Sequence, residues 1–207
     1  AIRRVFVPRT LETAVTAALK ARLDGATLGD PRQDGVRLGP LVSRAQRDDV
    51  RAKIAEIARE AEIVHGAPDE ADDAFPEPLR GGAFLRPVLL RCGSPLTASA
   101  AHTVEAFGPV ATVMPYDSID EAVTLVAKGE GSLVASVYTY DDAVADALVF
   151  GLTPFHGRVL IVDRDCAKES TGHGSPLPML IHGGPGRAGG GEEMGGIRGV
   201  FHYMQRT

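Results

Sequence analysis

The sequence predicts an α/β protein built on a mostly parallel sheet with crossover helices. The first observation is that strand-like and helix-like segments alternate between residues 110 and 163 in the order β-α-β-α-β, the pattern of parallel strands joined by helices. The second is a pair of helical patterns nearer the amino terminus. The third is the composition, because 207 residues with 44% hydrophobic side chains suffice for a globular domain with one core.

The first 61 residues predict a strand followed by two helices. Residues 1–8 alternate β-branched and apolar side chains in the manner of a strand. Ser43 and Gln46 form a capping box, in which each side chain can satisfy an unpaired backbone N–H, and the helix that follows runs to about residue 61. The earlier helix follows Pro8, ends at Gly25 and has its apolar residues at helical spacing: Leu11, Val15, Ala18, Leu19 and Leu23.

The rest of the chain supplies the remaining strands and two further helices. Residues 66–82 form an acidic loop with several prolines, to which we assign no function. A second capping box at Ser118–Glu121 begins a helix that stops at Gly129, and another helix covers 141–152. The expected strands are 62–66, 83–92 with an edge-type proline at 87, 110–117, 132–139, 157–163 and a terminal run at 199–207.

Composition and charge exclude several classes of partner. The formal charge is −5 and the basic residues are dispersed, so we expect no nucleic-acid partner. Apolar runs stay well short of a membrane span, so we expect no membrane partner. Cys92 and Cys166 lack C-x-x-C spacing, which favours free thiols, a reducing compartment and therefore the cytoplasm.

The glycine-rich segment 182–196 contains Gly184, Gly186 and Gly189 in the spacing G-x-G-x-x-G. A dinucleotide-binding turn also needs a strand before it, a helix opening on it and an acid about 20 residues later. Prolines at 176 and 178 precede this segment, and the sequence ends too soon for the acid. We therefore interpret the segment as a shaped surface wall rather than a phosphate cradle.

Three other features are weaker candidates for a catalytic or metal-binding site. Cys92 and Cys166 lie outside any nucleophile motif, and free cysteines are commonly small buried apolar residues. Residues 172–176 place Ser175 directly after Gly174 but do not match G-x-S-x-G, and Pro176 removes a backbone N–H that an oxyanion hole would use. The histidines show no pair at metal-ligand spacing, so we predict no metal site; they are His65, His102, His156, His173, His182 and His202.

Glu105 is the one acid in the segment EAFGPV at 105–110, among small and apolar residues between two predicted strands. A carboxylate there can accept two charge-assisted hydrogen bonds from a vicinal diol such as a ribose. The alternative interpretation is a solvated acid in a turn, which composition alone favours.

The segment EAFGPV resembles the E-x-F-G-P-V element of the aldehyde dehydrogenase superfamily. Other motifs follow in the family's order: AIRRV at 1–5, GDP at 29–31, GPLVS at 39–43 with Gln46, GAFLRPVLL at 82–90 and the glycine-rich segment. Residues 167–178, 182–193 and 202–207 are most similar to the branch that oxidises semialdehydes carried on coenzyme A thioesters in phenylacetate or benzoate degradation. The resemblance implies the three-layer catalytic domain of that family over residues 1–207, with a terminal strand near 199–207 that pairs in oligomerisation.

The resemblance also implies a reaction. A cysteine thiolate adds to the aldehyde, a hydride passes to the nicotinamide of NAD or NADP, and a glutamate-activated water releases the acid. The family's pattern Cys-x-Ala-x-x-Arg places that cysteine two positions before Ala1, and the glutamate earlier still, so no catalytic residue is expected within 1–207. We expect the chain alone to be inactive, and its partners to be a dinucleotide-binding domain upstream, a CoA-linked semialdehyde and further copies of itself.

By the same resemblance, Glu105 and Phe107 are the expected cofactor-binding residues, holding the nicotinamide ribose and lying near the nicotinamide ring. Gly183, Gly184, Gly186 and Gly189 are expected to line a substrate channel or a subunit interface, where glycine lets backbone approach backbone or ligand. The family's serine in this segment is replaced by Ala188 or a neighbouring glycine. Likeness to the CoA-linked branch favours NADP over NAD. A non-catalytic interaction module with a dehydrogenase-like fold is the alternative.

Overall fold

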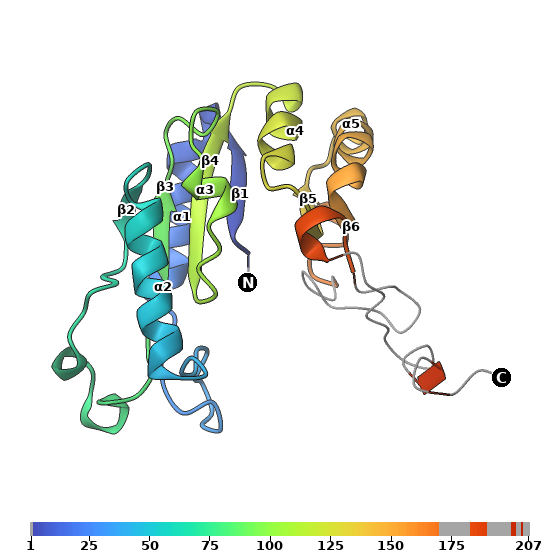
Figure 1. Cartoon of the computed structure of the whole chain (residues 1–207). Helices are drawn as coiled ribbons and strands as arrows, with labels where there is room; N and C mark the ends of the chain where they lie inside the picture. The colour runs from blue at the N-terminus through green and yellow to red at the C-terminus, as the bar shows by residue number, and fades with distance from the viewer. Residues whose placement is uncertain (1, 170–182, 190–199, 202–203, 205–207) are drawn as a thin grey trace. The chain divides into compact units, whose positions relative to one another are not determined.

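The computed structural model describes residues 2–169, 183–189, 200–201 and 204. They fall into two compact units, Ala1–Asp117 and Ser118–Thr207, and each unit is described here by itself (Figure 1). Both units contain parallel strands joined by helices, so the predicted α/β class with a mostly parallel sheet is confirmed.

The first unit is built on a four-stranded sheet in the order β1-β4-β3-β2. Its strands are β1 (Arg4–Pro8), β2 (Glu62–His65), β3 (Val88–Arg91) and β4 (Val110–Tyr116). β4 pairs in parallel with β1 on one side and with β3 on the other, whereas β2 is antiparallel to β3. Val113 lies opposite Val5 of β1 and Arg91 of β3, which fixes the register at the centre of the sheet.

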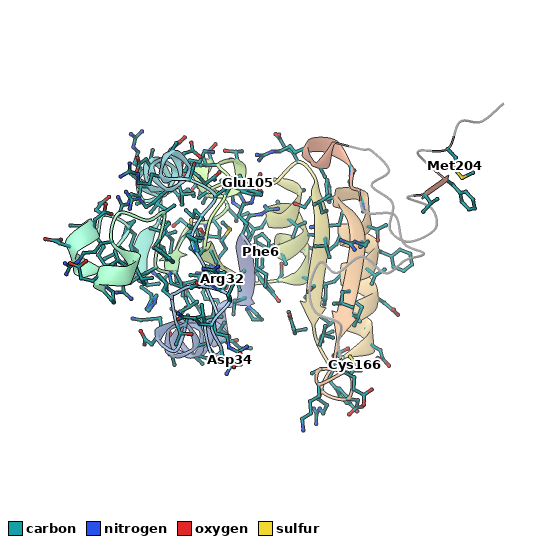
Figure 2. The ribbon with its side chains drawn as sticks, turned by 90° about the horizontal axis from the view of Figure 1, so that it is seen from below. Phe6, Arg32, Asp34, Glu105, Cys166 and Met204 are labelled. Carbon is teal, nitrogen blue, oxygen red and sulfur yellow. The ribbon has the colours of Figure 1, made fainter. Side chains whose placement is uncertain are left out.

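Helices cover both faces of this sheet. Figure 2 shows α1 (Glu12–Asp24) on one side and α2 (Arg44–Ile57), together with Glu105, on the other. The short α3 (Ala100–Thr103) contacts α2. This unit therefore has three layers, and β4 contributes buried residues to both interfaces, as a central parallel strand must: Val113 faces the α1 side, while Val110 and Met114 face the α2 side.

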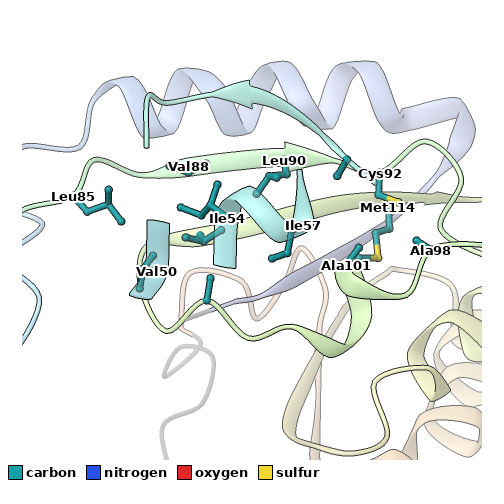
Figure 3. Close-up of a cluster of buried hydrophobic side chains, with 13 residues drawn as sticks. Val50, Ile54, Ile57, Leu85, Val88, Leu90, Cys92, Ala98, Ala101 and Met114 are labelled. Atoms are coloured by element: carbon teal, nitrogen blue, oxygen red, sulfur yellow. The ribbon is translucent and has the colours of Figure 1, made fainter. Parts of the chain in front are cut away.

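The larger core lies between α2 and the sheet. Val50, Ile54 and Ile57 recur along one face of α2, and each has at most 2% of its surface exposed. They pack against the apolar side chains of β3 and β4, among them Val88, Leu90 and Met114, as Figure 3 shows. The helical spacing of the α2 residues matches the predicted amphipathic helix, although the helix ends at Ile57 rather than near residue 61 because a turn at 58–60 precedes β2.

Two prolines lie next to or within the strands of this sheet. β3 begins only at Val88, and it is a central strand, so the edge position expected for Pro87 is wrong; Pro87 precedes the ladder and needs no N–H there. Pro115 lies within β4, pairs with Val7 of β1 and is buried. It is tolerated because β3 ends at Arg91, opposite Val113, so no strand remains to accept an N–H on that side.

The second unit contains the expected αβαβ order. Ser118 begins α4 (Ile119–Ala127) by accepting a hydrogen bond from the Glu121 N–H at 3.2 Å, which confirms this half of the capping box. β5 (Ser132–Tyr138), α5 (Asp142–Leu152) and β6 (His156–Val162) follow, and β5 and β6 form a separate two-stranded parallel sheet. Gly151 brings α5 against α4, where an added Cβ would lie 2.4 Å from Val123 Cγ2.

The remaining described elements are single 3₁₀ turns. They are η1 (Arg9–Leu11), η2 (Asp72–Ala74), η3 (Glu77–Leu79), η4 (Thr153–Phe155) and η5 (Gly186–Ala188). Within the terminal run 199–207 the structure describes only Val200, Phe201 and Met204; the first two have helical backbone, so no strand is observed there, and the rest of the expected strand lies outside the described residues.

Candidate functional site

The segment that carries Glu105 connects α3 to β4. Its side chains alternate between core and solvent. Val104 and Ala106 pack into the core beside α2, whereas Glu105 and Phe107 are exposed. Phe107 has 71% of its surface exposed, so its ring is open to solvent. The structure therefore leaves both predicted cofactor-binding residues exposed to solvent within residues 104–108, which we call the Glu105 loop.

Hydrogen bonds fix the backbone of the Glu105 loop. The Gly108 N–H donates to the Ala106 carbonyl and the Val110 N–H to the Gly108 carbonyl, each at 2.8 Å, which gives two successive γ-turns. The carbonyl of Phe107 accepts a hydrogen bond from Gln46 Nε2 at 3.0 Å. Phe107 is thus held by its backbone while its ring stays exposed.

The contact from Gln46 corrects one part of the sequence analysis. In the capping box, Ser43 Oγ does accept the Gln46 N–H at 3.1 Å. The Gln46 side chain was expected to return to the start of its own helix, but it reaches the Glu105 loop, 61 residues away in sequence. No local pattern distinguishes these two uses of the same amide.

Close packing of Gly108 against α2, and hydrogen bonds from the start of α3 to Glu60, hold the Glu105 loop beside α2. An added Cβ at Gly108 would lie 3.0 and 3.1 Å from the two methyl groups of Val50, which is fully buried. The carboxylate of Glu60, just after α2, accepts the Ser99 N–H at 2.9 Å and the Ala101 N–H at 3.3 Å. These bonds satisfy backbone donors at the start of α3. The chain is therefore anchored before Glu105 by Glu60 and after it by the contacts of Phe107 and Gly108 with α2.

Glu105 itself is left available. Among the described residues its carboxylate has no hydrogen-bond or ion-pair partner, and it is exposed, as is the Phe107 ring two residues further along the chain. Two free carboxylate oxygens on a fixed backbone match the donors of a vicinal diol, and an exposed aromatic face matches a flat heterocycle. The residues present therefore fit the ribose and nicotinamide end of a dinucleotide.

The described part of the glycine-rich segment, residues 183–189, packs against the starts of β5 and β6 within the second unit. An added Cβ at Gly157 would lie 1.7 Å from the Gly183 carbonyl oxygen, and one at Gly131 would lie 2.0 Å from that of Pro185. The Arg187 N–H donates to the Glu130 carbonyl at 2.9 Å. Glycine is thus required at positions 131 and 157, because the backbone of residues 183–185 approaches them too closely for a side chain.

A phosphate cradle finds no support in residues 183–189. Gly186 and Gly189 have φ of 56° and 88°, values that favour glycine, but only the single turn η5 lies between them. A helix long enough to present its amino terminus to phosphate is missing from these described residues. The residues on either side, 170–182 and 190–199, lie outside the described residues, and so does the serine of 172–176.

The other candidate groups form no site. Cys92 is fully buried in the core, and burial raises the pKa of its thiol, which disfavours the reactive thiolate. Cys166 is exposed in the turn after β6, where its sulfur accepts the Asp163 N–H at 3.3 Å. Both cysteines are free, as expected. Over the described ranges no three His, Cys, Asp or Glu residues gather as metal ligands, and none of the helices described there could cross a bilayer.

Comparison with known proteins identifies relatives. A model described as the aldehyde dehydrogenase family matches residues 1–206. Protein MaoC of Klebsiella aerogenes is 48% identical over 171 residues, which cover 82% of this chain and 49% of that protein. The 3,4-dehydroadipyl-CoA semialdehyde dehydrogenase of Aromatoleum evansii is 43% identical over 190 residues, which cover 89% of this chain and 36% of the enzyme. The chain thus spans half or less of these relatives' length.

Solved structures agree with these relatives. Betaine aldehyde dehydrogenase from Staphylococcus aureus in complex with NAD+ shares the fold, with a TM-score of 0.80 and 23% identity over 97% of this chain and 36% of that one. A C291A mutant of aldehyde dehydrogenase C from Pseudomonas syringae, complexed with NAD+ and octanal, has a TM-score of 0.77 and 29% identity, covering 98% of this chain and 38% of that one.

Proposed function

The chain belongs to the aldehyde dehydrogenase family, and we propose that it is the catalytic-domain part of an NAD(P)-dependent enzyme that oxidises a CoA-linked semialdehyde to the acid. The single observation that carries the proposal is the Glu105 loop. Its backbone is fixed by Gln46 and by the Val50 packing, while Glu105 and Phe107 are exposed and available to a ligand.

Glu105 and Phe107 are proposed to bind the nicotinamide half of the cofactor. The Glu105 carboxylate accepts hydrogen bonds from the two ribose hydroxyls, and the Phe107 ring contacts the flat heterocycle beside it. When bound, the cofactor supplies the acceptor for the hydride. NADP is favoured over NAD by likeness to the CoA-linked branch, and the residues that would distinguish the two belong to the dinucleotide-binding domain expected upstream.

The substrate class rests on the relatives. The sequence is 43% identical to a protein named for a CoA-linked semialdehyde, and the motifs at 167–178 and 182–193 resemble the same branch. We infer a place in phenylacetate or benzoate degradation. Gly183, Gly184, Gly186 and Gly189 are proposed to line a substrate channel or subunit interface of a homo-oligomer, with the nucleophilic cysteine just upstream of Ala1.

The test is an assay of the complete enzyme, purified from the gene that contains this chain. We expect reduced cofactor to appear, measured by absorbance at the nicotinamide band, with a CoA-linked semialdehyde and much more slowly with the same semialdehyde freed of CoA. Equal rates with both substrates would contradict the CoA assignment, and no oxidation of any aldehyde would contradict the reaction.

The upstream sequence offers an independent check. A reading frame ending in Gly-Gln-x-Cys-Thr directly before Ala1 would place the nucleophile as proposed. Intact-mass measurement of the native protein then separates an enzyme from a small interaction module, because a mature product of 21.8 kDa would contain this chain alone. The isolated chain should show no dehydrogenase activity. Turnover by the isolated chain would contradict the proposal that the nucleophile and the dinucleotide-binding domain lie upstream.

A further inference from the structure

His102 is the least exposed of the buried polar side chains described in the first unit. It lies in α3 with 1% of its surface exposed. Its Nδ1 is 3.2 Å from Arg4 Nη1, and its Nε2 is 2.8 Å from the carbonyl oxygen of Pro95. Both ring nitrogens therefore have partners, one on β1 and one in the segment before α3.

The partners determine where the ring proton lies. A guanidinium group has only donors, so Arg4 must donate and Nδ1 must accept. A carbonyl oxygen only accepts, so Nε2 must carry the proton and donate to Pro95. His102 is thus held as the neutral Nε2–H tautomer. The Arg4 guanidinium also lies over the Phe6 ring, 5.2 Å from its centroid, which restricts its orientation.

The contact joins two segments that the proposed reaction must keep in register. Arg4 begins β1, and the nucleophilic cysteine is expected five residues before it, at the start of the motif Cys-x-Ala-x-x-Arg. His102 lies three residues before Glu105. The ring belongs to the second segment and accepts from the first, so the Arg4 contact resists sliding between them, while the bond to Pro95 fixes the orientation of the ring within its own segment.

We propose that His102 is a positioning residue, which fixes the start of β1 relative to the Glu105 loop and thereby sets the nucleophile against the nicotinamide end of the cofactor. This inference rests on the proposed function. It assigns no chemistry to the ring, because the ring is buried and both of its nitrogens are occupied by Arg4 and Pro95. A displacement of about 1 Å between reacting groups can cost about 100-fold in rate, so such a contact affects turnover even when the fold survives.

Two variants of the complete enzyme, each keeping one of the two ring-nitrogen contacts, separate positioning from folding. His102→Asn places an oxygen near the Nδ1 position and keeps an acceptor for Arg4, whereas His102→Gln keeps a donor near Nε2 for Pro95 and loses the Arg4 contact. We expect kcat/KM for the aldehyde to fall about 10-fold or more in His102→Gln and to stay within about threefold in His102→Asn. Thermal midpoints should fall similarly in both, since each loses one buried hydrogen bond.

Several outcomes would overturn the inference. If Asn and Gln lower kcat/KM equally, or if both leave it unchanged, the bond to Arg4 does not position the site. Nitrogen-15 NMR of the unsubstituted protein is a second measurement that requires no variant to fold, and a protonated Nδ1 on His102 would remove the proposed contact. A wild-type enzyme that oxidises no aldehyde refutes the proposed function, whereas an active enzyme indifferent to both substitutions refutes only the role of His102.

Discussion

Replacing Gly108 with alanine tests whether the Glu105 loop depends on close packing against α2. The new Cβ would lie 3.0 and 3.1 Å from the methyl groups of Val50, tighter than ordinary van der Waals contact. Val50 is fully buried and cannot turn toward solvent. Overpacking of this kind costs about 1–3 kcal/mol, so we expect Gly108→Ala to lower the free energy of unfolding by about 2 kcal/mol.

A double-mutant cycle isolates that contact. Val50→Ala removes both methyl groups and alone should cost about 2–3 kcal/mol, from lost burial and the cavity left behind. In the double variant the Gly108→Ala methyl occupies part of the vacated space. The combined loss should then be about 2–3 kcal/mol rather than the sum of about 4–5, a coupling of about 2 kcal/mol.

Urea unfolding followed by far-ultraviolet circular dichroism gives the free energies, and native-state hydrogen exchange of the β4 amides reports the first unit separately. Gly25→Ala is the matched control, because Gly25 has a φ of −82° and its added Cβ would be 3.7 Å from the nearest atom; we expect a change within about 1 kcal/mol. A Gly108→Ala variant as stable as the wild type, or strictly additive losses, would refute the packing account.

Three further predictions concern other parts of the chain. Glu130 is the only described non-glycine residue with positive φ, at 57°, so Glu130→Gly should stabilise the protein by about 0.5–1 kcal/mol; a lower thermal midpoint would contradict this. Arg9 donates two hydrogen bonds to Asp117, and these hold the pKa of the Asp117 carboxyl below its usual 3.8. The ion pair therefore contributes its full stabilisation of the fold above pH 3.8, and this contribution is lost as the pH falls through the lowered pKa. The thermal midpoints of wild type and Asp117→Asn should therefore differ at neutral pH and converge in acid, and a constant gap would count against the ion pair. Cys166 should react at once with a thiol reagent and Cys92 only on unfolding, since only Cys166 is exposed; two fast thiols in the native protein would be inconsistent with the core.

The helices and most strands could be predicted from the sequence because capping residues and hydrophobic periodicity depend only on neighbouring residues. Ser43 and Ser118 do begin helices by accepting an N–H three residues ahead, and Gly25 does end α1. The αβαβ order from Ser118 to Val162 follows from short periodic patterns that involve no distant residue. The cofactor-binding role of Glu105 and Phe107 follows from the family resemblance and stays a prediction, because the exposure of Glu105 is expected both of a ribose-binding acid and of a solvated acid in a turn.

What the sequence could not give depends on distant contacts. Gln46 reaches Phe107 across 61 positions, and Arg4 reaches His102 across 98. Pro87 was expected on an edge strand, and its place just before the central strand β3 depends on which strands flank β3. The glycines at 131 and 157 are explained only by the carbonyl oxygens of residues 185 and 183 that approach them. Each case requires knowing which segment lies opposite.

The most direct test of the central claim is the affinity of the complete enzyme for its nicotinamide cofactor, measured by titration calorimetry for wild type, Glu105→Gln and Glu56→Gln. Glu56 is an exposed acid on α2 and serves as the control. Hydrogen bonds to a charged group contribute about 1.5–3 kcal/mol, so Glu105→Gln should weaken binding roughly 10- to 100-fold while Glu56→Gln leaves it unchanged. Unchanged affinity in Glu105→Gln would show that this carboxylate does not hold the ribose.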